Sequence, residues 1–160
     1  MEELVVLDQK QTILIRKMEL KEAINVAPIV IDGYEKEYKM RFDVAKTLNT
    51  WGKWLCNSNY IALGAFLESK WIGSIVGCLY VNPYNADIEA REVLWYVLPE
   101  FRSTKAGSNL LGYFENWAKI SGAKRIYMFY FSGIDPDCRM EKMYKRKGFV
   151  PFQTEVVKEV

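Results

Sequence analysis

The 160-residue chain contains no histidine. This absence excludes Ser-His-Asp and Cys-His catalysis and every histidine-ligated metal centre. Acid–base chemistry must therefore fall to Glu, Asp, Lys, Tyr or Cys side chains. Cysteine is also scarce, because only Cys56, Cys78 and Cys138 occur, an odd number at wide spacing. This pattern argues against a disulfide framework and against a cysteine-based zinc site, so no metal is predicted.

Long apolar runs are absent as well. The best candidate, residues 71–81, is shorter than the ~20 residues of a membrane span and is interrupted by Gly73, Ser74 and Gly77. Residues 1–6 lack the basic region and apolar core of a signal peptide. With 22 Lys and Arg against 20 Asp and Glu, the net charge of +2 gives no pull toward nucleic acid or membrane. We therefore expect a cytoplasmic protein without a nucleic-acid or membrane partner.

The residues that are present predict one α/β (α+β) domain spanning residues 1–160. Half of them are hydrophobic, which is enough to build a single sizeable core. Pro28 is expected to stop the first helix, and Gly122 stands where the third should be capped. Strand patterns occur at about 12–16, 60–67, 71–81, 91–98, 126–131 and 149–157, and helical patterns at about 20–27, 44–55, 106–121 and 139–146. This order fits a mixed sheet with helices on both faces.

A polar loop after the strand at 91–98 is the most informative segment. It opens into a helix near Ala106, where amide N–H groups lack internal partners and the helix dipole is positive. Such a terminus binds phosphate, and Gly107 lets the backbone approach a ligand. Further side-chain donors are Ser103, Thr104, Lys105 and Ser108. A plain polar connection between a strand and a helix remains the alternative explanation.

The same segment resembles a known family. Its residues Trp95-Tyr96-Val97-Leu98-Pro99-Glu100-Phe101-Arg102 are similar to Leu-Tyr-Val-x-Pro-Glu-Tyr-Arg, which ends strand four in the GNAT superfamily of N-acetyltransferases. The family loop Gln/Arg-x-x-Gly-x-Gly/Ala corresponds to Arg102-Ser103-Thr104-Lys105-Ala106-Gly107, with Lys105 at the first glycine. Downstream, Tyr144, Gly148 and Phe149 match Tyr-x-x-x-Gly-Phe, while Asp137 replaces the family's Asn and Met140 its Ala. The resemblance covers roughly residues 12–157 and is strongest over 92–149.

The resemblance implies a mostly antiparallel sheet of six to seven strands with about four helices, and acetyl-CoA as cosubstrate. A backbone N–H near Val97 or Leu98 would bind the thioester carbonyl. The pyrophosphate would lie on the loop formed by Arg102, Ser103, Thr104, Lys105, Ala106, Gly107 and Ser108, with Asp137 also near the cofactor. A basic cluster at Lys142, Lys145, Arg146 and Lys147 is either a solvated helix face or a contact for the 3′-phosphate.

The resemblance also implies the catalytic groups. Tyr144 matches the family's general acid, and Glu92 matches a Glu that some members use as base, with Glu89 and Asp87 as fallbacks. Period-two alternation predicts that Glu92 shares a face of its strand with Tyr96. The reaction would acetylate a primary amine on a small molecule or a protein.

Two other classes of function stay open. A GNAT fold that has lost catalysis could act as a binding protein, and Lys105 and Asp137 are the departures that favour it. A small basic nucleic-acid module is disfavoured by the near-neutral charge. Oligomeric state is open between monomer and homodimer.

Overall fold

The computed structural model describes residues 12–131, 133 and 137–160. They fall into two compact units, one ending at Met128 and one spanning Phe129–Val160. The first unit contains β1 (Ile13–Lys17), α1 (Leu20–Tyr38), α2 (Val44–Leu55), β2 (Tyr60–Leu67), β3 (Lys70–Val81), β4 (Ile88–Val97), the short 3-10 helix η1 (Pro99–Phe101), α3 (Ala106–Ile120) and β5 (Arg125–Tyr127). The second contains α4 (Arg139–Arg146). Within these described ranges no helix is both long and apolar enough to cross a membrane.

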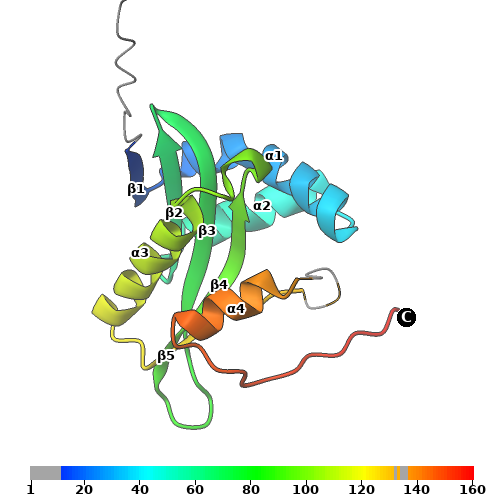
Figure 1. The fold of residues 1–160 in the computed structure, drawn as a ribbon. Coiled ribbons are helices and arrows are strands. Elements are labelled where there is room, and N and C mark those ends of the chain that lie inside the picture. Colours follow the sequence, from blue (N-terminus) through cyan, green and yellow to red (C-terminus); the bar gives the residue numbers. More distant parts are fainter. Residues whose placement is uncertain (1–11, 132, 134–136) are drawn as a thin grey trace, which may run out of the picture. The chain divides into compact units, whose positions relative to one another are not determined.

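The five strands form one sheet in the order β1-β2-β3-β4-β5 (Figure 1). All neighbours are antiparallel except β4 and β5, which run parallel. This last pairing covers only Glu89–Arg91 of β4, which continues alone to Val97 on that side. The sheet therefore opens along the second half of β4.

Helices cover both faces of the sheet. Figure 1 shows α3 on one face and α1 and α2 on the other. On the α3 face, Leu110, Phe114 and Ala118 pack in a buried cluster with strand residues that include Ile72 and Ile75. On the opposite face, Val30 and Tyr34 of α1 pack with strand residues Ala62, Phe66, Leu94 and Tyr96. The first unit thus has the predicted mixed, mostly antiparallel sheet, and the described residues contain four α-helices.

The first helix corrects one prediction. Pro28 was expected to stop it, but α1 continues to Tyr38 with Pro28 inside. Proline removes one backbone hydrogen bond, at a cost of about 3 kcal/mol in a helix interior. Beyond it, Val30, Ile31 and Tyr34 are all buried, and each such side chain contributes about 1.5–3 kcal/mol. Packing therefore outweighs the local break.

The strand count also differs from the prediction of six to seven, since the described residues form five. The pattern at 149–157 predicted a last strand, but this segment has no strand pairing and is mostly exposed. Alternation shows that a segment fits a strand but not whether a sheet edge is available to it. The predicted cap of α3 is confirmed, because Gly122 has a φ of +83° directly after that helix.

Candidate active site

A β-bulge lies where β5 leaves β4. Glu92 pairs with Gly77 of β3, and the next pair is Leu94 with Val76, so Val93 is the extra residue. A bulge interrupts the alternation of side chains and bends its strand. It comes directly after Arg91, the last residue of β4 that pairs with β5.

The bulge decides which face carries Glu92. A side chain at Gly77 would overlap the ring of Phe114, so this pair of residues lies on the α3 face. Tyr96 instead pairs with Ser74 and packs against Tyr34 of α1. The prediction that Glu92 and Tyr96 share a face was therefore wrong. The Glu92 side chain is buried, with 3% of its surface exposed.

Backbone groups at the open edge of β4 are mostly bonded to side chains. The Leu98 N–H donates to the Ile72 carbonyl of β3 at 2.9 Å, so by alternation the groups of Trp95 and Val97 point away from β3. The Tyr34 hydroxyl donates to the Trp95 carbonyl at 3.1 Å and accepts from the Trp95 N–H at 3.3 Å. Burial raises the pKa of Tyr34 well above its usual range, which keeps this hydroxyl protonated.

Val97 completes this edge. Its carbonyl accepts a hydrogen bond from Nε of Arg102 at 2.9 Å. Its N–H points to the same open side, and no hydrogen bond to it occurs within the described part of the chain. Of the two donors predicted for the thioester carbonyl, Leu98 is thus already bonded, whereas Val97 is available.

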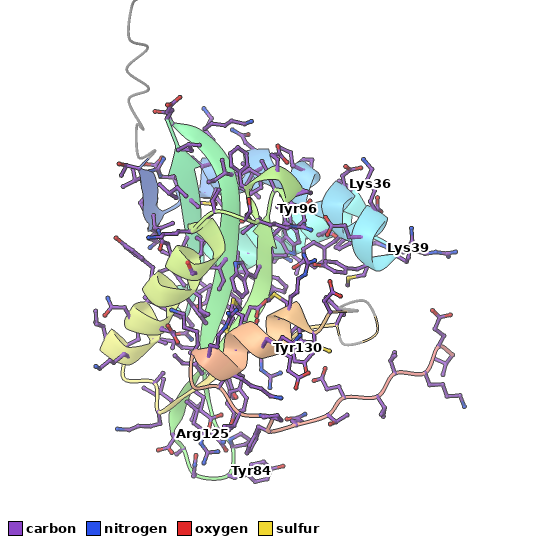
Figure 2. The ribbon with its side chains drawn as sticks, viewed as in Figure 1. Lys36, Lys39, Tyr84, Tyr96, Arg125 and Tyr130 are labelled. Atoms are coloured by element: carbon purple, nitrogen blue, oxygen red, sulfur yellow. The ribbon has the colours of Figure 1, made fainter. Side chains whose placement is uncertain are left out.

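The Arg102 guanidinium faces α1. Its Nη1 and Nη2 donate to the two carboxylate oxygens of Glu37 at 2.8 and 2.7 Å. It lies 5.4 Å from the centre of the Tyr96 ring, and the Tyr96 hydroxyl also donates to Glu37 at 3.3 Å. Tyr96 of β4 points toward the C-terminal end of α1, where Glu37 lies (Figure 2). Burial lowers the pKa of Arg102, but the hydrogen bonds to Glu37, together with the negative charge of Glu37 and the nearby Tyr38 and Tyr96, leave the pKa raised. The side chain predicted to bind phosphate is therefore held by a carboxylate.

The loop before α3 presents backbone donors. The Thr104 hydroxyl donates to the Phe101 carbonyl at 2.6 Å and accepts from the Ala106 N–H at 3.2 Å. The N–H groups of Gly107 and Ser108, in the first turn of α3, have no partner among the described residues. Such donors fit a pyrophosphate.

Lys105 stands at a glycine position of the family loop. Its φ of −78° is an ordinary conformation for any L residue, so no glycine is required there. The side chains of Ser103 and Lys105 are exposed. The substitution therefore leaves the geometry of the loop unstrained.

Glu89 and Asp87, the alternative candidates for the base, form hydrogen bonds with neighbouring side chains. Glu89 has 1% of its surface exposed and accepts hydrogen bonds from the Tyr80 hydroxyl at 2.6 Å, Asn82 Nδ2 at 3.0 Å and the Tyr127 hydroxyl at 3.5 Å. The bond from Tyr80 is the main cause that lowers the pKa of Glu89. This carboxylate joins β3, β4 and β5. Asp87 accepts from Asn85 Nδ2 at 3.0 Å in the turn between β3 and β4.

The second unit contains the remaining predicted residues. Tyr144 of α4 is buried, its hydroxyl donates to the Phe129 carbonyl at 3.2 Å, and its ring lies 5.4 Å from that of Phe149. Asp137 is exposed and pairs with Arg139 at 3.0 Å. In the basic cluster, Lys145 pairs with Glu141 at 2.6 Å, and all four cationic residues are exposed.

Sequence reasoning missed the contribution of α1. Tyr34 and Glu37 both contact β4 or its following loop, yet the segment 29–42 shows no clear element when Pro28 is read as a helix end. The helical spacing of Val30, Tyr34 and Tyr38 is the signal that could have located this face.

The sequence was compared with models of known protein families. Residues 28–149 match the Acetyltransferase (GNAT) family. The chain belongs to that family. The open edge of β4 and the donor-rich start of α3 are thus features of a GNAT acetyltransferase domain. No curated protein matches the GNAT chain in sequence.

Solved structures share the fold. A GNAT family acetyltransferase of Staphylococcus aureus subsp. aureus USA300_TCH1516 has 17% identity and a TM-score of 0.69, over 93% of this chain and 99% of that one. A ribosomal-protein-alanine N-acetyltransferase of Brucella melitensis biovar Abortus 2308 has 16% identity and a TM-score of 0.73, over 93% and 99%. AAC(6')-Iy, solved with a bisubstrate analog containing CoA, has 16% identity and a TM-score of 0.71, over 93% and 98%. At these identities the likeness supports the fold alone.

Proposed function

We propose that this GNAT protein transfers the acetyl group of acetyl-CoA to a primary amine by direct attack. The observation that carries the proposal is the open edge of β4. Side chains form hydrogen bonds with the Trp95 N–H, the Trp95 carbonyl and the Val97 carbonyl there. The Val97 N–H has no hydrogen bond among the described residues. A preorganised N–H of this kind stabilises the negative charge that develops on a carbonyl oxygen during acyl transfer.

The cosubstrate fits the donors of the loop. The N–H groups of Gly107 and Ser108, at the positive end of the α3 dipole, would hold the pyrophosphate. Acetyl-CoA, when bound, supplies a thioester whose acetyl group passes to the amine as the carbon–sulfur bond breaks. Ser103, Thr104, Lys105 and Ala106 would shape the loop, and Asp137 would lie near the cofactor.

Two side chains would move protons. Glu92, acting directly or through water, would accept the proton that the amine nitrogen loses as it attacks. The hydroxyl of Tyr144 would donate its proton to the departing thiolate, because phenols and alkyl thiols have similar acidity in model compounds. Val97 would hold the acyl oxygen throughout.

Residues 1–160 would act as one catalytic domain, since the family match at 28–149 runs through the end of the first unit and into the second. The acceptor would be an amine on a small molecule or a protein, and the protein would work in the cytoplasm.

Thermal stabilisation by acetyl-CoA tests the binding step. A ligand at 100 times its Kd stabilises the folded state by about 2.7 kcal/mol, or roughly 5–10 °C for a chain of this size. Gly107→Glu should abolish this shift, because its carboxylate would stand beside the pyrophosphate. Gly112→Glu is the matched control, since it adds the same charge to α3 at a position where a Cβ meets no atom within 4 Å.

Turnover requires a second measurement. Labelled acetyl-CoA and a panel of candidate amines and proteins, followed by mass spectrometry, would reveal the acetylated product. Binding without any product would favour the alternative of a catalytically inactive GNAT binding protein. The absence of a thermal shift at millimolar acetyl-CoA would contradict both.

A further inference from the structure

A salt-bridged group joins α1 to the end of β4. The Arg102 side chain directs all of its described hydrogen bonds away from the loop that precedes α3: Nε to the Val97 carbonyl at 2.9 Å, and Nη1 and Nη2 to Glu37 at 2.8 and 2.7 Å. The fork geometry of the guanidinium matches the two carboxylate oxygens. We refer to Glu37 and Arg102 together as the α1 clasp.

We propose that Glu37, acting through Arg102, is a positioning residue that fixes the Val97 segment for acyl transfer. This inference rests on the proposed function. The two hydrogen bonds to Glu37 hold the guanidinium in an orientation in which Nε donates to the Val97 carbonyl. The Val97 carbonyl is the last β4 group on the open edge, and β5 offers it no partner because the pairing with β5 ends at Arg91.

Tyr96 ties the clasp to the core. Its ring packs at 5.9 Å from Tyr34 and lies beneath Arg102, while its hydroxyl donates to Glu37. Glu37 therefore contacts both residue 96 and, through Arg102, residue 97. The peptide that joins these two residues carries the Val97 N–H proposed to bind the acyl oxygen.

The α1 clasp should contribute more to the positioning of Val97 than to the free energy of unfolding. The side chains of Arg102 and Glu37 are 42% and 27% exposed, and ion pairs with such access to water contribute little to folding. Acyl transfer is far more sensitive, because a displacement of about 1 Å at a catalytic group can lower a rate by about 100-fold. Loss of Glu37 should thus lower turnover more than stability.

Two roles of Arg102 can be distinguished by mutation: direct binding of phosphate, and positioning of Val97 together with Glu37. If the guanidinium bound pyrophosphate, Glu37→Gln would free it and leave CoA binding unchanged or stronger, whereas Arg102→Gln would weaken CoA binding. If the pair is a clasp, both variants should lower kcat by a similar factor, about 10-fold or more, with the Kd for CoA within about threefold of the unmutated value. The double variant should be no worse than either single one, because both remove the same unit.

The experiment measures kcat, the Kd for CoA by calorimetry, and the ¹⁵N–¹H resonance of Val97 without ligand. Both single variants should shift the Val97 resonance, and Arg102→Lys should not restore kcat, because an ammonium cannot bond Glu37 and Val97 in the same fork. The matched control is Asp32→Asn, which breaks an exposed ion pair with Lys36 in the same helix and should change none of these quantities.

Several results would overturn the inference. Additive losses in the double variant, an unmoved Val97 resonance, or a kcat for Glu37→Gln equal to that of Asp32→Asn would each do so. If a Gln variant does not fold, Arg102→Lys alone decides the question through the Val97 resonance. Failure of the proposed function is a separate result, since the unmutated protein would then show no turnover, whether or not it binds CoA.

Discussion

The same substitution should have opposite effects at two helical glycines. Gly33 lies in the buried face of α1, where an added Cβ would overlap the hydroxyl of Tyr96 and lie 2.6 Å from its Cε2. Gly52 lies in α2, and a Cβ there meets no atom within 4 Å. Gly33→Ala and Gly52→Ala therefore gain the same helix propensity but differ in packing.

The magnitudes follow from these contacts. Replacing Gly by Ala in a helix interior stabilises by about 1 kcal/mol, whereas overpacking a core costs about 1–3 kcal/mol. Tyr96 cannot retreat freely, because it packs against Tyr34 and beneath Arg102. Gly33→Ala should thus destabilise by up to about 2 kcal/mol, and Gly52→Ala should stabilise by about 1 kcal/mol.

Urea and thermal denaturation would measure both effects. At about 2–4 °C per kcal/mol, Tm should fall by up to roughly 8 °C for Gly33→Ala and rise by roughly 2–4 °C for Gly52→Ala. An increase in Tm for Gly33→Ala that equals the increase for Gly52→Ala would refute the reasoning, because it would mean that Tyr96 yields without cost.

Three further predictions concern titratable groups. Tyr144→Phe keeps the ring and removes the proton donor, so kcat should fall by about 10- to 1000-fold with little change in CoA binding; an unchanged kcat in single-turnover kinetics would reduce Tyr144 to a packing residue. Glu92→Gln should lower turnover at neutral pH but approach the unmutated enzyme toward about pH 10, where the amine is already deprotonated; parallel pH–rate profiles would contradict a base. The hydrogen bond from Arg16 lowers the pKa of Glu22 from 4.5 to about 2, so its contribution is present above pH 4.5 and is lost as pH falls toward 2. Denaturation of Glu22→Gln should accordingly show a weaker loss of stability over that interval, and an identical acid profile would exclude the contribution of this pair.

Local signals in the sequence were sufficient for the family and for most elements. The run Trp95–Arg102 and the Tyr144–Phe149 spacing indicated a GNAT protein, and the helix starts near Val44, Ala106 and Arg139 were predicted closely. These features depend on contacts within one or two turns of chain, such as the first turn of α3, so a short window contains the information. The absence of histidine likewise limits the catalytic groups through composition alone, whatever the fold.

Tertiary structure decided the features that position the site. The bulge at Val93 moved Glu92 to the face opposite Tyr96, and it exists only in the pairing of β4 with β3. The partner of Arg102 is Glu37, 65 positions away, in a helix that local propensity would have ended at Pro28. Residues 149–157 can form a strand only if a sheet edge is available for pairing, and the alternation of their own side chains does not determine this. Such choices are made by packing between distant segments, where burial and hydrogen bonding outweigh the local preference of each residue.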